Sequence, residues 1–89
     1  MKVIVTVVGK DQVGIIAAVC IRLAEYNVNV LDISQTVMQG YFTMMMVVEV
    51  GACNVPLADL CEKMEELGKE KSLSIRVQRE DIFEAMHRI

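Results

Sequence analysis

Two kinds of apolar pattern alternate along this chain, and their order limits the possible folds more than any single residue does. The patterns indicate a strand, a helix, two strands, a helix and a strand, over residues 2–8, 13–26, 28–38, 41–50, 57–67 and 73–78. The chain therefore repeats strand–helix–strand in two halves of similar length, roughly residues 2–39 and 42–79.

This order predicts an α+β fold, a ferredoxin-like βαββαβ sandwich in which both helices cover one face of a four-stranded antiparallel sheet. Right-handed crossovers place the first and third strands in the centre of the sheet. We expect a single domain over residues 1–89, with a core at 2–79 and a helical tail at 80–89. Because the helices cover one face only, the other face or a sheet edge is expected to meet a second subunit.

Local signals give finer predictions for the connections between these elements. Asn27 is expected to end the first helix in the left-handed conformation, and Gly68 is expected to terminate the second helix. Gln39 and Gly40 predict a hairpin turn. The alternation over 28–38 is imperfect, so this strand either contains a bulge or lies in a two-sided environment.

Composition excludes several classes of function and points to an apolar contact surface. The 89 residues are 54% hydrophobic, with a mean hydropathy of +0.41, which is more apolar material than a small monomer readily buries. The net charge is −3 and no basic stripe is present, which argues against binding nucleic acid. No apolar run reaches the ~20 residues of a membrane span. The three cysteines cannot all pair, so we expect a reducing cytoplasm and no disulfide.

Residues 9–15, which we call the glycine turn, connect the first strand to the first helix. The first backbone N–H groups of a helix lack intrahelical partners and, with the helix dipole, suit a carboxylate or another small anion. We expect Asp11 to be the N-cap, accepting from the N–H of Val13 or Gly14. Gly14 would let a ligand approach closely. The alternative is a capped helix whose glycine packs tightly on the sheet.

Other activities that use this fold lack their characteristic residues here. Acylphosphatase-like enzymes need an arginine in the turn, which carries only Lys10, and metal-carrying relatives need a Cys-x-x-Cys there. RNA-binding relatives need aromatic residues in mid-strand, whereas Tyr41 and Phe42 lie at a strand's start. His87 is the only histidine, and no nucleophile pairs with it in sequence. We therefore expect neither catalysis nor a metal or other cofactor.

The pattern Gly-x-Asp-x-x-Gly-Ile at 9–15, followed by Glu-Tyr-Asn-Val-Asn-Val at 25–30, resembles the ACT domain family. That family places an Asp or Asn three residues before the glycine, then an apolar helix, then a turn of Gly-Val-Asn-Ile type. The resemblance covers about residues 3–78. The closing segment, 76–89, also resembles the tail of small free-standing single-ACT-domain proteins of bacteria and archaea.

The resemblance implies a regulatory role, since ACT domains mostly bind amino acids at subunit interfaces and regulate metabolic enzymes or transcription. In members with a known effector site, the ligand contacts positions that correspond to Gly9, Asp11 and Asn29, although Gly9 has no side chain to donate. Together, the turn and the resemblance give the candidate ligand-binding residues Gly9, Lys10, Asp11, Gln12, Val13, Gly14, Ile15 and Asn29.

Three functions remain open at this point. The leading hypothesis is a non-catalytic module that binds a small ligand, expected to be an amino acid, as a homodimer and acts through a regulated enzyme or transcription factor. The second is an assembly module with a vestigial pocket. A distant third is a small acylphosphatase-like enzyme.

Overall fold

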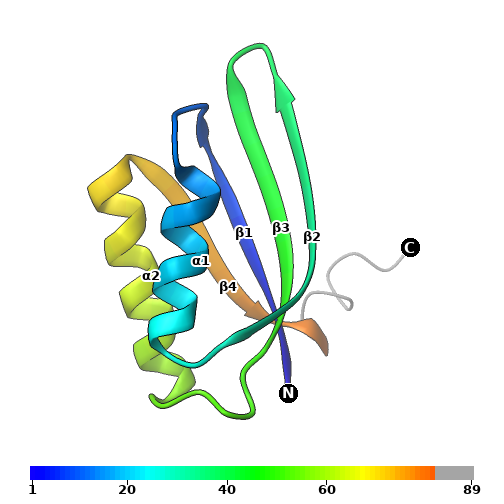
Figure 1. Cartoon of the computed structure of the whole chain (residues 1–89), viewed down its shortest axis with the longest axis vertical. Coiled ribbons are helices and arrows are strands. Elements are labelled where there is room, and N and C mark those ends of the chain that lie inside the picture. The colour runs from blue at the N-terminus through cyan, green and yellow to red at the C-terminus, as the bar shows by residue number, and fades with distance from the viewer. Residues whose placement is uncertain (82–89) are drawn as a thin grey trace.

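The computed structural model describes residues 1–81, and its elements follow the predicted order (Figure 1). The elements are β1 (Lys2–Lys10), α1 (Ile15–Glu25), β2 (Asn29–Met38), β3 (Tyr41–Glu49), α2 (Leu57–Lys71) and β4 (Leu73–Arg79). The helix predicted at residues 80–89 lies outside the described residues, apart from its first two positions.

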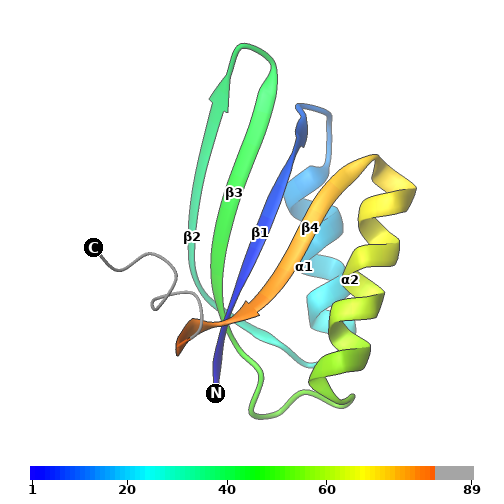
Figure 2. The ribbon, with the colours of Figure 1, turned by 180° about the vertical axis from the view of Figure 1, so that it is seen from behind.

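The strands form one antiparallel sheet in the order β2-β3-β1-β4, so the first and third strands are central, as predicted. Both helices lie on the same face of the sheet, and Figure 2 shows the opposite face without a helix over it. The predicted ferredoxin-like α+β fold is therefore confirmed. It leaves β2 and β4 as the two edge strands.

The core lies between the two helices and the central strands. Alternate side chains of β3 are buried, as their period-two pattern predicted, while Met45 on the opposite face is 37% exposed. Core side chains from β3 and from the helices are Phe42, Met44, Met46, Val48, Ile15, Val19, Leu23, Leu60, Met64 and Leu67. Beyond this core, the β2–β3 hairpin extends past the end of α1 (Figure 1).

Turn geometry confirms most of the predicted connections. Asn27 has φ 59°, and Gln39 and Gly40 have φ 52° and 81°, which gives the two-residue turn of a tight hairpin. The pairing of β2 with β3 shifts register between Val30 and Asp32, so the imperfect alternation of β2 reflects a bulge.

The prediction that Gly68 terminates the second helix is wrong. The helix continues to Lys71, and Ser72 ends it in the left-handed conformation with φ 58°. Gly68 is buried inside the helix, where an added Cβ would lie 2.6 Å from the carbonyl oxygen of Leu73. The glycine therefore allows α2 to approach β4 closely, which is a tertiary requirement and not a signal to stop.

Candidate functional site

The glycine turn is held between the β2–β3 hairpin and the end of α2. The backbone N–H of Asp11 donates to the carbonyl oxygen of Gly40 at the hairpin tip, at 2.8 Å. On the other side, the Gln12 side-chain Nε2 donates to the carbonyl oxygen of Lys71 at 2.9 Å. These two bonds fix the turn at one end of the molecule, beside the tip of the hairpin.

The predicted N-cap role of Asp11 is wrong. Helix α1 begins at Ile15, two residues later than expected, and its N-cap is Gly14 with φ 85° and ψ 11° and no side-chain cap bond. Asp11 lies too far before this first turn to cap it, and its side chain is exposed. A residue with a Cβ is strained in the left-handed conformation, whereas glycine adopts it without this cost, so the cap position favours glycine.

The space around Gly14 is open. An added Cβ at Gly14 would meet no atom within 4 Å, so the alternative in which this glycine packs tightly on the sheet is also wrong. The first intrahelical bond joins the Ala18 N–H to the Gly14 carbonyl oxygen at 2.9 Å. The N–H groups of residues 15–17 precede this bond, so the open space lies at the donor end of α1.

Gly9 lies directly against Leu73 of β4. An added Cβ there would lie 2.5 Å from Cδ2 of Leu73, whose side chain is buried against the core. The position that departs from the ACT effector pattern is therefore filled by a side chain from β4. Gly9 itself offers a ligand only its backbone.

Asn29 is separated from the other candidate residues. It opens β2 at the opposite end of α1, and the eleven residues of that helix span about 16 Å. Asn29 lines a shallow hollow of about 270 Å³ together with Ala24, Asn27, Val28 and Ala52. Within one chain, the structure brings together residues 9–15 and leaves Asn29 apart.

Exposed apolar side chains flank the glycine turn on α1 and β2. Val13 in the turn is fully exposed and Ile21 on α1 is 60% exposed, while Ile33 and Val37 on β2 are 39% and 54% exposed. Ile33 and Val37 pair with Met46 and Phe42, so they continue the core face of the sheet past the point where the helices cover it. Sequence reasoning missed this surface because the bulge disguised the alternation of β2.

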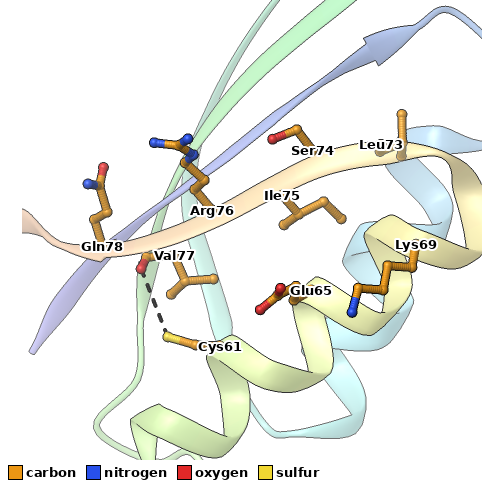
Figure 3. Close-up of a pocket in the computed structure, with 9 residues that line it drawn as sticks. All are labelled: Cys61, Glu65, Lys69, Leu73, Ser74, Ile75, Arg76, Val77 and Gln78. Carbon is orange, nitrogen blue, oxygen red and sulfur yellow. Dashed lines mark hydrogen bonds between the residues drawn. The ribbon is translucent and has the colours of Figure 1, made fainter.

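A second recess, which we call the α2/β4 groove, lies at the other edge of the sheet (Figure 3). It has a volume of about 540 Å³ and is lined by Cys61, Glu65, Lys69, Leu73, Ser74, Ile75, Arg76, Val77 and Gln78. The Cys61 thiol donates to the Val77 carbonyl oxygen at 3.9 Å, and burial raises the pKa of this thiol. From the sequence alone, Cys61 fits the apolar face of this helix and Glu65 its solvated face, so no local pattern predicts the groove.

Neither a metal-binding cluster nor a membrane-spanning helix is found in the part of the chain that the structure describes. Within residues 1–81, no group of three or more His, Cys, Asp or Glu side chains is arranged to hold a metal ion. In the same range, no helix is both long enough and apolar enough to cross a membrane.

A ferredoxin-like sandwich whose first strand meets its first helix at a glycine-capped turn has the architecture of an ACT-type domain. The model of the ACT domain family matches residues 2–78, and the chain belongs to that family. ACT domains are commonly regulatory ligand-binding modules.

Close relatives have the same size and come from bacteria and archaea. A UPF0237 protein of Bifidobacterium longum is 52% identical over 88 residues, covering 99% of this chain and 98% of the relative. A UPF0237 protein of Methanosarcina acetivorans is 48% identical over 88 residues, covering 99% and 96%. The solved structure of an ACT domain protein from Streptococcus pneumoniae matches with a TM-score of 0.82 and 44% identity, over 94% of both chains.

Proposed function

We propose that this ACT domain is a non-catalytic regulatory module that binds an amino acid at the interface of a homodimer. One observation carries the proposal, the 2.8 Å bond from the Asp11 N–H to the Gly40 carbonyl oxygen. This bond fixes the glycine turn beside the hairpin tip, where the exposed edge of β2 ends. A ligand at the turn would therefore lie next to any chain that pairs with β2.

The edge of β2 supports a dimer. Among residues 1–81, strand β2 pairs with β3 alone, so its other edge is unpaired by them over ten residues, and nearby Ile33 and Val37 expose apolar surface. A long unpaired edge with apolar side chains is a template for pairing with another chain. Two copies of β2 related by a two-fold axis would form one continuous antiparallel sheet.

Pairing through β2 would complete the candidate site. In an antiparallel two-fold pair of β2 strands, the start of one strand, with Asn29, lies toward the end of the other strand, with Met38. The partner subunit's Asn29 then lies near the hairpin tip, and so near the glycine turn. The ligand carboxylate would accept from the N–H groups of residues 15–17, and its ammonium group would donate to Asp11 and the partner's Asn29.

The assembly-module alternative also has support in the structure. Gly9 has no side chain and lies against Leu73, and the Gln12 Nε2 group already donates to Lys71, so neither residue is positioned only for a ligand. In that alternative the dimer is the function and the open space at Gly14 is vestigial. Under both hypotheses, any regulatory output passes through a further enzyme or transcription factor.

We also propose a cytoplasmic location, because the three cysteines are free and a reducing compartment keeps thiols in that state.

Thermal melts of the full chain with each common amino acid at millimolar concentration test the proposal. We expect at least one to raise the melting temperature, since a ligand at a hundredfold excess over its Kd stabilises by about 2.7 kcal/mol. Asp11→Ala and Asn29→Ala should lose this shift, while Glu62→Gln, which removes an exposed charge on α2, should keep it. No shift in the parent would favour the assembly module, and hydrolysis of an acyl phosphate would revive the enzyme.

The dimer is tested separately by sedimentation. Val37 is 54% exposed on the helix side of β2, so we expect the charge of Val37→Asp to convert a dimer to monomers without unfolding the chain. A parent that sediments as a monomer at micromolar concentration would contradict the dimer and, with it, the composite site.

A further inference from the structure

The sheet face that α1 and α2 leave uncovered, which we call the far face, is not uniformly exposed (Figure 2). Its side chains alternate with the core residues of the strands, and on the central strand β1 they include Ile4 and Val8. Ile4 is 6% exposed, whereas Val8, four residues further along the same strand and face, is 42% exposed. One end of the far face is therefore covered, and the other end is exposed.

The change in burial runs in step across neighbouring strands. The covered end contains one residue from each of three paired strands, Ile4, Val47 and Gln78, which we call the Ile4 patch. Val47 and Gln78 are half-buried, while Thr43 and Ser74, the two residues that pair with Val8, are exposed. Because three strands share this trend, a layer of chain over one end of the face explains it better than the shape of any single side chain.

The chain leaves the sheet at this same end. Arg79, the last residue of β4, pairs with Val3, which directly precedes Ile4. Helical backbone follows at once, at Glu80 and Asp81. The Arg79 guanidinium donates to the Asp81 carboxylate at 2.7 Å and 3.2 Å, and acidic residues in a first turn favour the start of a helix. The described chain thus ends with a helix beginning beside the Ile4 patch.

The remaining residues, 82–89, have the sequence of an amphipathic helix. Four apolar side chains recur at helical spacings that place them on one face, Ile82, Phe83, Met86 and Ile89. Glu84 and Arg88 belong to the opposite face and are spaced as a helical ion pair. A helix over ten residues, 80–89, is about 15 Å long, and the three strand spacings from β4 to β2 amount to about 14 Å. The segment therefore has the length to cross the whole sheet.

We propose that residues 80–89 form a third helix that lies across the far face and covers the Ile4 patch with its apolar side chains. The chain's own segment is favoured over a separate protein, because it begins beside the patch and reaches it without association. This helix closes one end of the far face to other molecules and leaves the end at Val8 available to them. The proposal does not depend on the amino-acid site.

Melting temperatures of full-length variants test whether the segment packs. Phe83→Ala removes its largest apolar side chain, and we expect the melting temperature to fall by about 5 °C or more. Arg88→Ala truncates a long side chain on the opposite helical face and should leave the melting temperature nearly unchanged. Equally small shifts in both variants would overturn the proposal.

Double-mutant cycles locate the contact. Val47→Ala shortens a side chain of the Ile4 patch, and Val8→Ala makes the same change at the exposed end of the far face. We expect Phe83→Ala, or Ile82→Ala or Met86→Ala in the same cycle, to lower the melting temperature less in Val47→Ala than in the parent. In Val8→Ala the shifts should equal those in the parent. Additivity of all three substitutions with Val47→Ala would overturn the location on the patch.

Protein concentration distinguishes the chain's own segment from that of a second copy. In the Val37→Asp background, the shift caused by Phe83→Ala should be the same over a hundredfold range of concentration, because the contact lies within one chain. A shift that appears only at high concentration would assign the covering helix to another copy and overturn the proposal.

Discussion

Replacement of Gly68 by alanine tests how the sheet and its second helix fit together. Gly68 lies inside α2, where glycine is normally a poor helix former, so alanine should stabilise the helix by about 1 kcal/mol. The structure opposes this gain, because the new methyl group would lie 2.6 Å from the Leu73 carbonyl oxygen and 3.4 Å from a side-chain carbon of Ile75.

The sign of the effect follows from which atom must move. Real Cβ atoms essentially never lie within 3.0 Å of another group, and the Leu73 oxygen belongs to the backbone, so it cannot rotate away. Overpacking of a buried site costs about 1–3 kcal/mol. After the gain in helix propensity is subtracted, we expect Gly68→Ala to lower the free energy of unfolding by up to about 2 kcal/mol. For a chain of this size that lowers the melting temperature by about 4–8 °C per kcal/mol.

Urea denaturation measures the change, and a pair of variants at Glu62 calibrates it. Glu62 is exposed on the same helix, so the difference between Glu62→Ala and Glu62→Gly gives the propensity term without any packing term. A Gly68→Ala protein that is more stable than the parent by that difference would show that α2 moves away freely. It would refute the close approach as the reason for the glycine.

Three further predictions concern the glycine turn and the N-terminus. Gly14→Ala should destabilise the fold by about 1–2 kcal/mol because of the left-handed backbone and not through contact, and Gly14→Asn should cost less in the same urea titration. Asp11→Ala should change stability by less than about 0.5 kcal/mol, because its side chain caps nothing; a loss near 1 kcal/mol would restore the cap. The Met1 ammonium group, 2.6 Å away, and the Gly51 N–H hold the pKa of Glu49 below its usual 4.5. Since this contact stabilises the fold only while Glu49 is ionised, stability should fall as the pH drops below about 4.5, and less steeply in Glu49→Gln; equal slopes in pH-dependent melts would contradict the contact.

The fold was predictable because its signals are periodic and redundant. The alternation of Phe42, Met44, Met46 and Val48 specifies a buried strand face, and the order of strands and helices then leaves few topologies. Many residues repeat the same information, so a single ambiguous position such as the bulge in β2 does not change the outcome.

Single glycines were harder to interpret because their roles are tertiary or conformational. Gly68 has the local signature of a helix end, yet contact with Leu73 determines its role. Gly14 and Asp11 are both plausible cap residues by composition, and only the observed φ of 85° distinguishes them. Asn29 was grouped with the turn by family resemblance, which carries no information on whether one chain or two supply the residues. The α2/β4 groove depends on how closely α2 approaches an edge strand, which no local pattern records.

The register of β1 has a consequence for the order in which this protein acquires its structure during synthesis. The N-terminal strand is central, and its neighbour on one side is the last strand, with Val3 opposite Arg79. A growing chain that has emerged through β3 can form a three-stranded sheet, but β1 then remains an open edge until residues 73–79 leave the ribosome. Contacts so distant in sequence form slowly, so the nascent chain exposes the apolar edge of β1 throughout most of its translation. We therefore expect ribosome-bound chains that stop short of β4 to need a chaperone, whereas the completed chain should fold without one.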